Sequence, residues 1–123
     1  MRAQPLIAVS DVEASAIWYS RLLSIDALGH GGGYEQLSSG GQLILQLHAW
    51  DEEDHPNLSN EDSDPIGLGV LIWFQTDDFE GVVKRAKELH AEVVEEPHVN
   101  PNSKLREIWL RDLDGYVVVV SSE

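Results

Sequence analysis

Apolar residues recur every three to four positions in two stretches of this chain, and this period predicts two amphipathic helices. The first helix is expected over residues 12–23 and the second over residues 79–90. An aspartate stands directly before each of them, Asp11 before the first and Asp78 before the second. A carboxylate at this place can accept hydrogen bonds from the free N–H groups of the first helical turn, so both aspartates are predicted to be N-caps.

Short apolar or alternating runs outside the two helices predict strands, and turn residues separate the strands. Ser39-Gly40-Gly41 and the Asp-Leu-Asp-Gly sequence over residues 112–115 predict hairpin turns, and residues 97–102 predict a loop rich in turns. The expected strands cover, in chain order, residues 6–9, 25–28, 34–38, 42–50, 70–76, 91–95, 105–111 and 116–121.

The two halves of the chain repeat one order of elements: a strand, an aspartate, a helix, and strands that end in a glycine-containing hairpin. Between the halves, residues 51–66 are acidic, contain two prolines and have no hydrophobic period, which indicates a solvated linker or a flexible loop. A repeated supersecondary unit favours paired modules. We therefore predict one α+β domain over residues 1–123, with module one over about 4–50 and module two over about 67–123.

Strand alternation separates an aliphatic face from a mixed aromatic and polar face in three of the expected strands. Trp50, Trp73 and Trp109 fall on the mixed faces. Because indole side chains are too large and apolar to be left in water without a reason, these faces are expected to line a concave ligand site. A dimer interface or a closed core is the alternative. The polar residues on the same faces are expected to orient a ligand, and they are Gln46, His48, Glu107 and Arg111.

Composition narrows the possible functions. The 123 residues include no cysteine, which excludes disulfides, thiolate metal sites and a cysteine nucleophile. The formal net charge of −14 argues against nucleic acid and anionic membrane surfaces as partners, and it favours either simple solubility or attraction of a cationic ligand. With no apolar segment long enough for a signal peptide or a membrane span, a cytoplasmic protein is expected.

Two segments resemble motifs of the vicinal-oxygen-chelate superfamily. VSDVEASAIWYSRLL, residues 9–23, is similar to its opening pattern V-x-D-x-x-x-S-x-x-[FW]-Y-x-x-x-L, and DLDGYVVVV, residues 112–120, is similar to its closing hairpin, with Leu113 in the place of a proline. The superfamily includes glyoxalase I, extradiol dioxygenases, fosfomycin-resistance enzymes and bleomycin-resistance binding proteins. The resemblance implies two βαβββ modules that form a curved mixed sheet around a cleft, with helices on the outer face, commonly in a homodimer.

The resemblance also implies where a metal would be held, because catalytic members bind a divalent ion through His and Glu from four strands. The matching positions in this chain are Gln4, Gln46, Leu71 and Val119, the second of them uncertain by one residue. Leucine and valine offer no donor, and a glutamine amide is a weak ligand compared with carboxylate or imidazole. We therefore expect no metal and no other cofactor at the usual site.

The sequence thus predicts a small-molecule-binding protein of the bleomycin-resistance type, with a cationic or aromatic ligand. The alternative is a metal-dependent lyase or dioxygenase that uses displaced ligands such as His48 and Glu107, which His98 could join, and then a divalent metal would be the cofactor. A third reading is an interaction module whose tryptophan face binds another subunit. His30, His55 and His90 have no evident partners in the sequence. The residues predicted to contact the ligand are Gln4, Gln46, His48, Leu71, Trp73, Glu107, Trp109 and Arg111.

Overall fold

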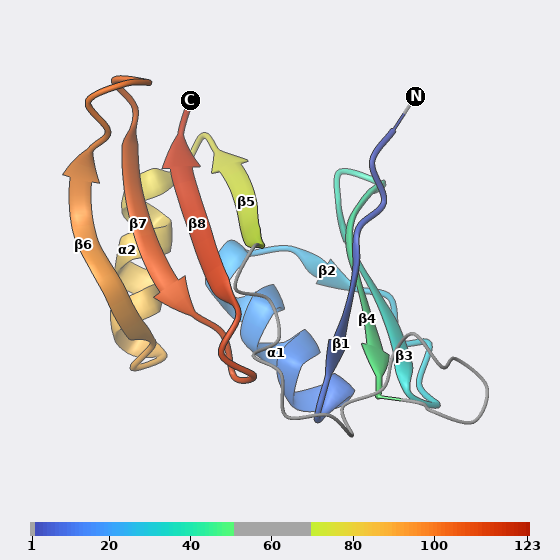
Figure 1. Ribbon diagram of the computed structural model, residues 1–123. Coiled ribbons are helices and arrows are strands. Elements are labelled where there is room, and N and C mark those ends of the chain that lie inside the picture. The colour runs from blue at the N-terminus through green and yellow to red at the C-terminus, as the bar shows by residue number, and fades with distance from the viewer. Residues whose placement is uncertain (1, 51–69) are drawn as a thin grey trace. The chain divides into compact units, whose positions relative to one another are not determined.

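The computed structural model describes residues 2–50 and 70–123. The chain divides into two compact units, Met1–Pro65 and Ile66–Glu123, each of which contains one helix and one four-stranded sheet (Figure 1). The acidic segment predicted over residues 51–66 lies outside the described residues. Each unit has the order strand, helix, three strands, so the predicted pair of βαβββ modules in an α+β fold is confirmed.

The first unit forms a mixed sheet with the strand order β1-β4-β3-β2. β1 runs parallel to β4, whereas β3 is antiparallel to both β4 and β2. A single register shift lies between Leu37 and Ser38 of β3. The elements are β1 (Leu6–Val9), α1 (Val12–Leu23), β2 (Asp26–Ala27), β3 (Tyr34–Ser39) and β4 (Gln42–Ala49).

Helix α1 spans the residues that the apolar period predicts. Asp11 is its N-cap, and the Asp11 carboxylate accepts a hydrogen bond of 2.9 Å from the N–H of Ala14. The helix packs against β3 and β4. Its fully buried Tyr19 and Leu22 share the core of this unit with aliphatic residues from one face of the sheet, which are Leu37, Leu45 and Leu47. The opposite face of β3 and β4 carries Tyr34, Gln36, Gln46 and His48.

The second unit repeats this arrangement with the strand order β5-β8-β7-β6, which can be followed across Figure 1. β5 runs parallel to β8, and β7 is antiparallel to both β8 and β6. Asp78 is the predicted N-cap of its helix and accepts a hydrogen bond of 3.1 Å from the N–H of Gly81. The elements are β5 (Leu71–Thr76), α2 (Phe79–Glu88), β6 (Glu92–Val99), β7 (Arg106–Arg111) and β8 (Val117–Ser122).

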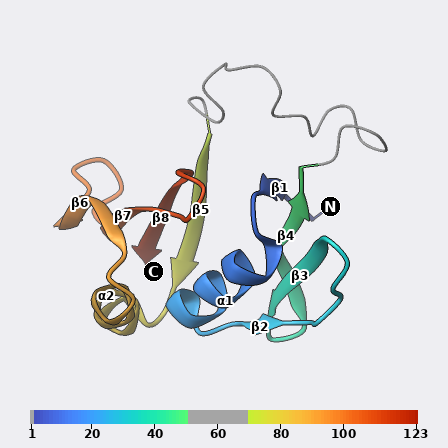
Figure 2. The same cartoon turned by 90° about the horizontal axis from the view of Figure 1, so that it is seen from below.

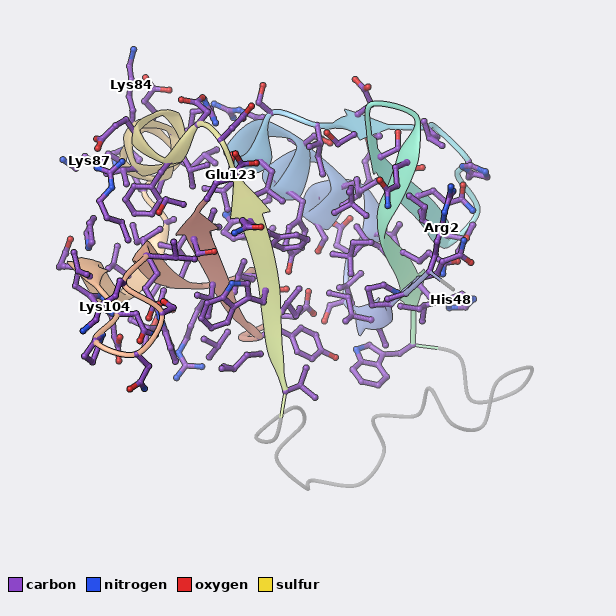
Figure 3. The ribbon with its side chains drawn as sticks, turned by 90° about the horizontal axis from the view of Figure 1, so that it is seen from above. Arg2, His48, Lys84, Lys87, Lys104 and Glu123 are labelled. Atoms are coloured by element: carbon purple, nitrogen blue, oxygen red, sulfur yellow. The ribbon has the colours of Figure 1, made fainter. Side chains whose placement is uncertain are left out.

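Helix α2 covers one face of the second sheet, as Figure 2 shows. Its buried residues Phe79, Val82 and Ala86 face the aliphatic residues of that sheet, and Lys84 and Lys87 extend away from it (Figure 3). Strand alternation predicts this division correctly. The buried sheet residues on the helix side are Ile72, Ile108, Leu110, Val118 and Val120.

Strand β6 differs from the prediction. It continues to Val99, through residues predicted as a loop, and contains Pro97. Because β6 is an edge strand, a proline without an N–H removes no hydrogen bond that the sheet needs. The pairing of β6 with β7 also shifts between Val93 and Glu95 and again between Glu95 and His98, so the ladder is interrupted at the proline. The extension places His98 within the sheet.

The hairpin between β7 and β8 forms as its Asp-Leu-Asp-Gly sequence predicts. Asp112 accepts hydrogen bonds of 2.9 Å from the N–H groups of Asp114 and Tyr116, and Gly115 adopts a positive φ of 94° that favours glycine. In the described residues no helix has the length and apolar character that a membrane crossing requires.

Candidate functional site

Two tryptophans meet on the face of the second sheet that α2 does not cover. Trp73 on β5 and Trp109 on β7 are both paired in register with Val119 on the intervening strand β8. Because β8 lies between β5 and β7 and neighbouring strands lie about 4.8 Å apart, the backbones of β5 and β7 are about 10 Å apart. The two ring centroids are only 6.4 Å apart, at an interplanar angle of 76°. The rings therefore lean toward each other above Val119, which is 0% exposed.

A hydrogen bond fixes the orientation of each indole. Trp73 Nε1 donates to the hydroxyl of Ser121 at 3.2 Å, and Trp109 Nε1 donates to Glu107 Oε1 at 2.9 Å. Trp73 nevertheless remains 46% exposed, and Trp109 is partly exposed. The result is an aromatic surface that is oriented by polar partners and is open to solvent within its unit.

Glu107 is a buried carboxylate beside this aromatic surface, with a side chain that is only 2% exposed. Burial raises its pKa, but hydrogen bonds donated by Trp109, Asn100 and His98 outweigh burial and bring the pKa below its ordinary value. The carboxylate is therefore negatively charged at neutral pH. It places a fixed anion 2.9 Å from the indole Nε1 of Trp109.

His98 and Glu95 complete a polar cluster around this carboxylate. His98 Nε2 lies 3.1 Å from Glu107 Oε1 and 3.4 Å from Glu95 Oε2, and its Nδ1 lies 2.8 Å from the backbone carbonyl of Glu96. The Glu96 carbonyl, and after it the Glu107 carboxylate, raise the pKa of His98 above its ordinary value against the opposing effect of burial. Glu95, His98 and Glu107 have ligand atoms within 4.8 Å of one another, which suits a metal ion.

The other two predicted residues of this unit lie at one end of the same face. Leu71 is exposed and pairs with Val117, which in turn pairs with Arg111. The Arg111 guanidinium donates to the carbonyl of Gly115 at 3.0 Å and lies 3.7 Å from a carboxylate oxygen of Glu92. Arg111 is thus engaged at the hairpin, and the cluster around Glu107 does not include it.

The predicted residues of the first unit belong to a separate polar row on the uncovered face of that sheet. Gln46 accepts a hydrogen bond from the Tyr34 hydroxyl and donates one of 3.0 Å to the backbone carbonyl of Gln4. Gln36 donates to the Tyr34 hydroxyl at 2.9 Å. His48, labelled on β4 in Figure 3, has its Nδ1 2.6 Å from the carbonyl of Ala49.

The residues at the four positions implied for a metal do not fit a divalent ion. Both ends of the Gln46 amide are already hydrogen-bonded within its own unit. Leu71 and Val119 have no donor atom, and Val119 lies beneath the two indole rings. The side chain of Gln4 alone cannot hold such an ion. No catalytic step is therefore derived through a metal at these positions.

Sequence reasoning missed several members of both polar groups. The sequence names His98 beside Glu107 but does not identify Glu95, because Glu95 and His98 are three residues apart and a regular strand would put them on opposite faces. Asn100 was assigned to a loop without a role. Tyr34 and Gln36 could have been found, because they alternate on β3 opposite His48 and Gln46, their partners in the antiparallel ladder.

His30 does have a partner, contrary to the prediction. Its Nδ1 lies 3.4 Å from an oxygen of Glu35, a buried carboxylate that also accepts hydrogen bonds from the N–H groups of Gly29 and Gln36. The glycine segment folds the chain back so that these groups meet. Sequence spacing alone gives no sign of this contact.

Comparison with known proteins agrees with this architecture. Residues 3–120 match the family model described as the Glyoxalase/Bleomycin resistance protein/Dioxygenase superfamily. No curated protein matches the chain significantly by sequence.

Solved structures share the fold at low sequence identity. A lactoylglutathione lyase from Agrobacterium tumefaciens is 22% identical, with coverage of 99% of this chain and 92% of its own, and a TM-score of 0.68. TioX from Micromonospora sp. ML1 is 17% identical, with coverage of 99% and 98% and a TM-score of 0.72. A protein of unknown function from Agrobacterium tumefaciens str. C58 is 19% identical, with coverage of 100% and 94% and a TM-score of 0.79. With its two βαβββ modules and a family match over nearly its whole length, this chain belongs to the glyoxalase/bleomycin resistance protein/dioxygenase superfamily.

Proposed function

We propose that this protein binds a small cationic aromatic molecule on the uncovered face of its second sheet, without the metal positions that catalytic relatives use. One observation carries the proposal: the indole of Trp109 is held by a buried, ionised carboxylate, Glu107, at 2.9 Å, and its ring leans toward the exposed ring of Trp73. This arrangement combines a π-surface with a fixed negative charge.

The chemistry of the ligand follows from these two features. The face of an indole ring attracts a cation by about 0.5–2 kcal/mol, depending on how far the pair is removed from water. The nearby carboxylate adds attraction for the same charge. An aromatic ligand also gains apolar contact with Trp73, whose side chain is exposed within its unit.

The charge of the whole chain supports the same ligand class. A net charge of −14 creates a negative potential that raises the encounter rate of cations, and salt screens this attraction. We expect the predicted contacts from Gln4, Gln46, His48, Leu71 and Arg111 to be secondary to those of Trp73, Glu107 and Trp109, because the latter three form one connected group.

A second candidate function is metal-dependent lyase or dioxygenase chemistry with displaced ligands. The sequence offers His48 and Glu107 for this role, with His98 as a residue that could join them, and the histidine that contacts Glu107 is His98, at 3.1 Å. A metal at that place would have to be shown before such a reaction is considered. A homodimer that covers the tryptophan face is the third candidate, and indole emission that shifts on dilution of the protein would support it.

The proposal is tested with chelator-treated protein and benzyltrimethylammonium as the probe. Its neutral analogue, in which a carbon replaces the quaternary nitrogen, is the matched control ligand. We expect the cation to quench tryptophan fluorescence saturably and the neutral analogue to bind at least about tenfold more weakly. Added salt should lower the affinity of the protein for the cation.

Two variants locate the binding. Trp73→Leu and Trp109→Leu each remove one indole ring and should weaken binding of the cation at least about tenfold, whereas Trp50→Leu, in the first unit, should leave it unchanged. Equal binding of the charged and neutral probes, or loss of binding only in the Trp50 variant, would rule out the proposed face.

A further inference from the structure

Three potential metal ligands converge on the edge of the second sheet, at positions that carry no ligand in the pattern expected from the family. Glu95 and His98 come from β6, and Glu107 comes from the neighbouring strand β7. Their ligand atoms all lie within 4.8 Å of one another. The usual metal positions, by contrast, are on or next to the first and last strands of each module.

A bulge in β6 makes this convergence possible. Glu95 pairs with Trp109 and His98 pairs with Glu107, so three steps along β6 match two steps along β7. The extra residue restores both side chains to one face of the sheet, where regular alternation would separate them. Bulges of this kind commonly re-aim a side chain toward a site.

The orientation of the imidazole indicates which atom is free for a cation. The carbonyl of Glu96 can only accept a hydrogen bond, so the Nδ1 of His98, 2.8 Å away, carries a proton and donates it. In the neutral ring, Nε2 then presents a lone pair to two carboxylate oxygens, Glu107 Oε1 at 3.1 Å and Glu95 Oε2 at 3.4 Å. Without a proton on Nε2 these three acceptors repel one another, so a divalent cation can take the place of the proton that Nε2 otherwise donates to Glu107.

Apart from His98, whose Nε2 faces both carboxylates, the described surroundings provide no cation for them. In the described part of the chain, neither Glu95 nor Glu107 forms an ion pair with a lysine or an arginine. The Glu107 oxygens are instead held by N–H donors from Asn100 and Trp109, which fix the carboxylate without neutralising it. A histidine that donates Nδ1–H to a backbone carbonyl while its Nε2 points toward other ligand atoms has the arrangement typical of histidine metal ligands.

We propose that Glu95, His98 and Glu107 bind one divalent transition-metal ion, with Zn²⁺ as the best fit. One imidazole and two carboxylates form a ligand set that zinc accepts, whereas Mg²⁺ and Ca²⁺ prefer oxygen ligands alone. The exposed fractions of Glu95 and His98, 49% and 34%, leave the ion open on one side to water or to a ligand atom. This site is separate from Gln4, Gln46, Leu71 and Val119. It shares Glu107 with the proposed site for organic cations, but each kind of binding is tested in the absence of the other ligand.

The test measures Zn²⁺ binding by calorimetry to chelator-treated full-length protein near neutral pH, with Co²⁺ absorption as a second readout. We expect one ion per chain. Loss of an outer-shell partner of a metal ligand costs about 10–100-fold in affinity, so His98→Ala, which removes a direct ligand, should cost about 100-fold or more. His90→Ala is the matched control and should bind as the unchanged protein does.

A second variant keeps the test decisive if His98→Ala fails to fold. Glu95 is half exposed, so Glu95→Gln leaves the sheet intact and should still weaken Zn²⁺ binding by at least about tenfold. Trp109 provides a local signal, because its indole donates to Glu107. Zn²⁺ should change the emission, and Trp109→Phe should remove that change and weaken the binding by about 10–100-fold without abolishing it.

Three results would overturn the proposal. The first is the absence of Zn²⁺ binding at millimolar concentration. The second is binding that Glu95→Gln and a folded His98→Ala leave unchanged. The third is binding that His55→Ala abolishes, since His55 belongs to the acidic segment between the halves and not to this cluster.

Discussion

Glu107 and Trp109 are held together by a hydrogen bond of 2.9 Å from the indole Nε1 to the carboxylate Oε1, across two positions of one strand. Because the two residues share a face of β7, the carboxylate fixes the ring and also places its charge beside it. Removing the charge should therefore separate the electrostatic part of ligand binding from the aromatic part.

The first prediction concerns this charge. Glu107→Gln retains a side-chain oxygen that can accept from Trp109 but removes the negative charge, so benzyltrimethylammonium should bind at least tenfold more weakly, or about 1.4 kcal/mol. The neutral analogue should be unaffected. Glu96→Gln, which changes an exposed carboxylate on the neighbouring strand, is the control, and an equal loss in both variants would mean that only the net charge matters.

The second prediction concerns the packing beneath the rings. Val119 is fully buried between Trp73 and Trp109 in the ladder, so Val119→Ala should destabilise the second unit by about 1–3 kcal/mol in a denaturant titration. It should also weaken binding of the organic cation, because the rings lose their support. Leu113→Ala, at an exposed hairpin position, should change neither quantity.

The third prediction concerns acid sensitivity of the first unit. Burial raises the pKa of Glu35, but hydrogen bonds from the N–H groups of Gln36, Gly29 and His30 and from the His30 ring outweigh burial, so the pKa is lowered below 4.5. A carboxylate with a lowered pKa stabilises the folded state above its unfolded pKa, and this stabilisation is lost as the pH falls through the folded value.

Glu35→Gln removes this contribution. At neutral pH it should lower the free energy of unfolding by about 1–3 kcal/mol, and the difference from the unchanged protein should disappear as the pH falls below about 4. The His30 ring contacts Glu35, so the same comparison in a His30→Asn background isolates the contribution of the Glu35 carboxylate. A difference that stays constant down to pH 2 would contradict the assignment.

The fourth prediction concerns the helix start that the sequence identifies. Asp11→Ala removes the acceptor for the N–H of Ala14 and should destabilise α1 by about 0.5–2 kcal/mol, with the loss seen in thermal unfolding. Glu13→Ala, in the same helical turn but without the capping contact, should cost less. Equal losses would show that charge near the helix end, and not the cap, is what stabilises it.

Most of the fold could be predicted because its signals are local. The apolar period gives the bounds of α1 without error, and the aspartates before the two helices cap them as expected. Alternation places Trp73, Glu107 and Trp109 on one face, since burial on the helix side requires it.

The polar cluster could not be predicted in full because it depends on an irregular ladder. The bulge between Glu95 and His98 changes which face each residue occupies, and no spacing rule shows where a strand will bulge. Pro97 in the middle of this segment favours a loop, although an edge strand tolerates it. The contact of His30 with Glu35 is also missed, because the glycine turn that creates it can adopt many backbone conformations.

The most direct test of the central claim is a titration of ¹⁵N-labelled protein with benzyltrimethylammonium, followed through the four indole N–H signals in a heteronuclear correlation spectrum. Binding at the proposed face predicts that the signals of Trp73 and Trp109 move together with one saturable dissociation constant, while those of Trp18 and Trp50 stay in place. Signals of Trp73 and Trp109 that remain unchanged at saturating probe, or movement confined to Trp50, would contradict the account.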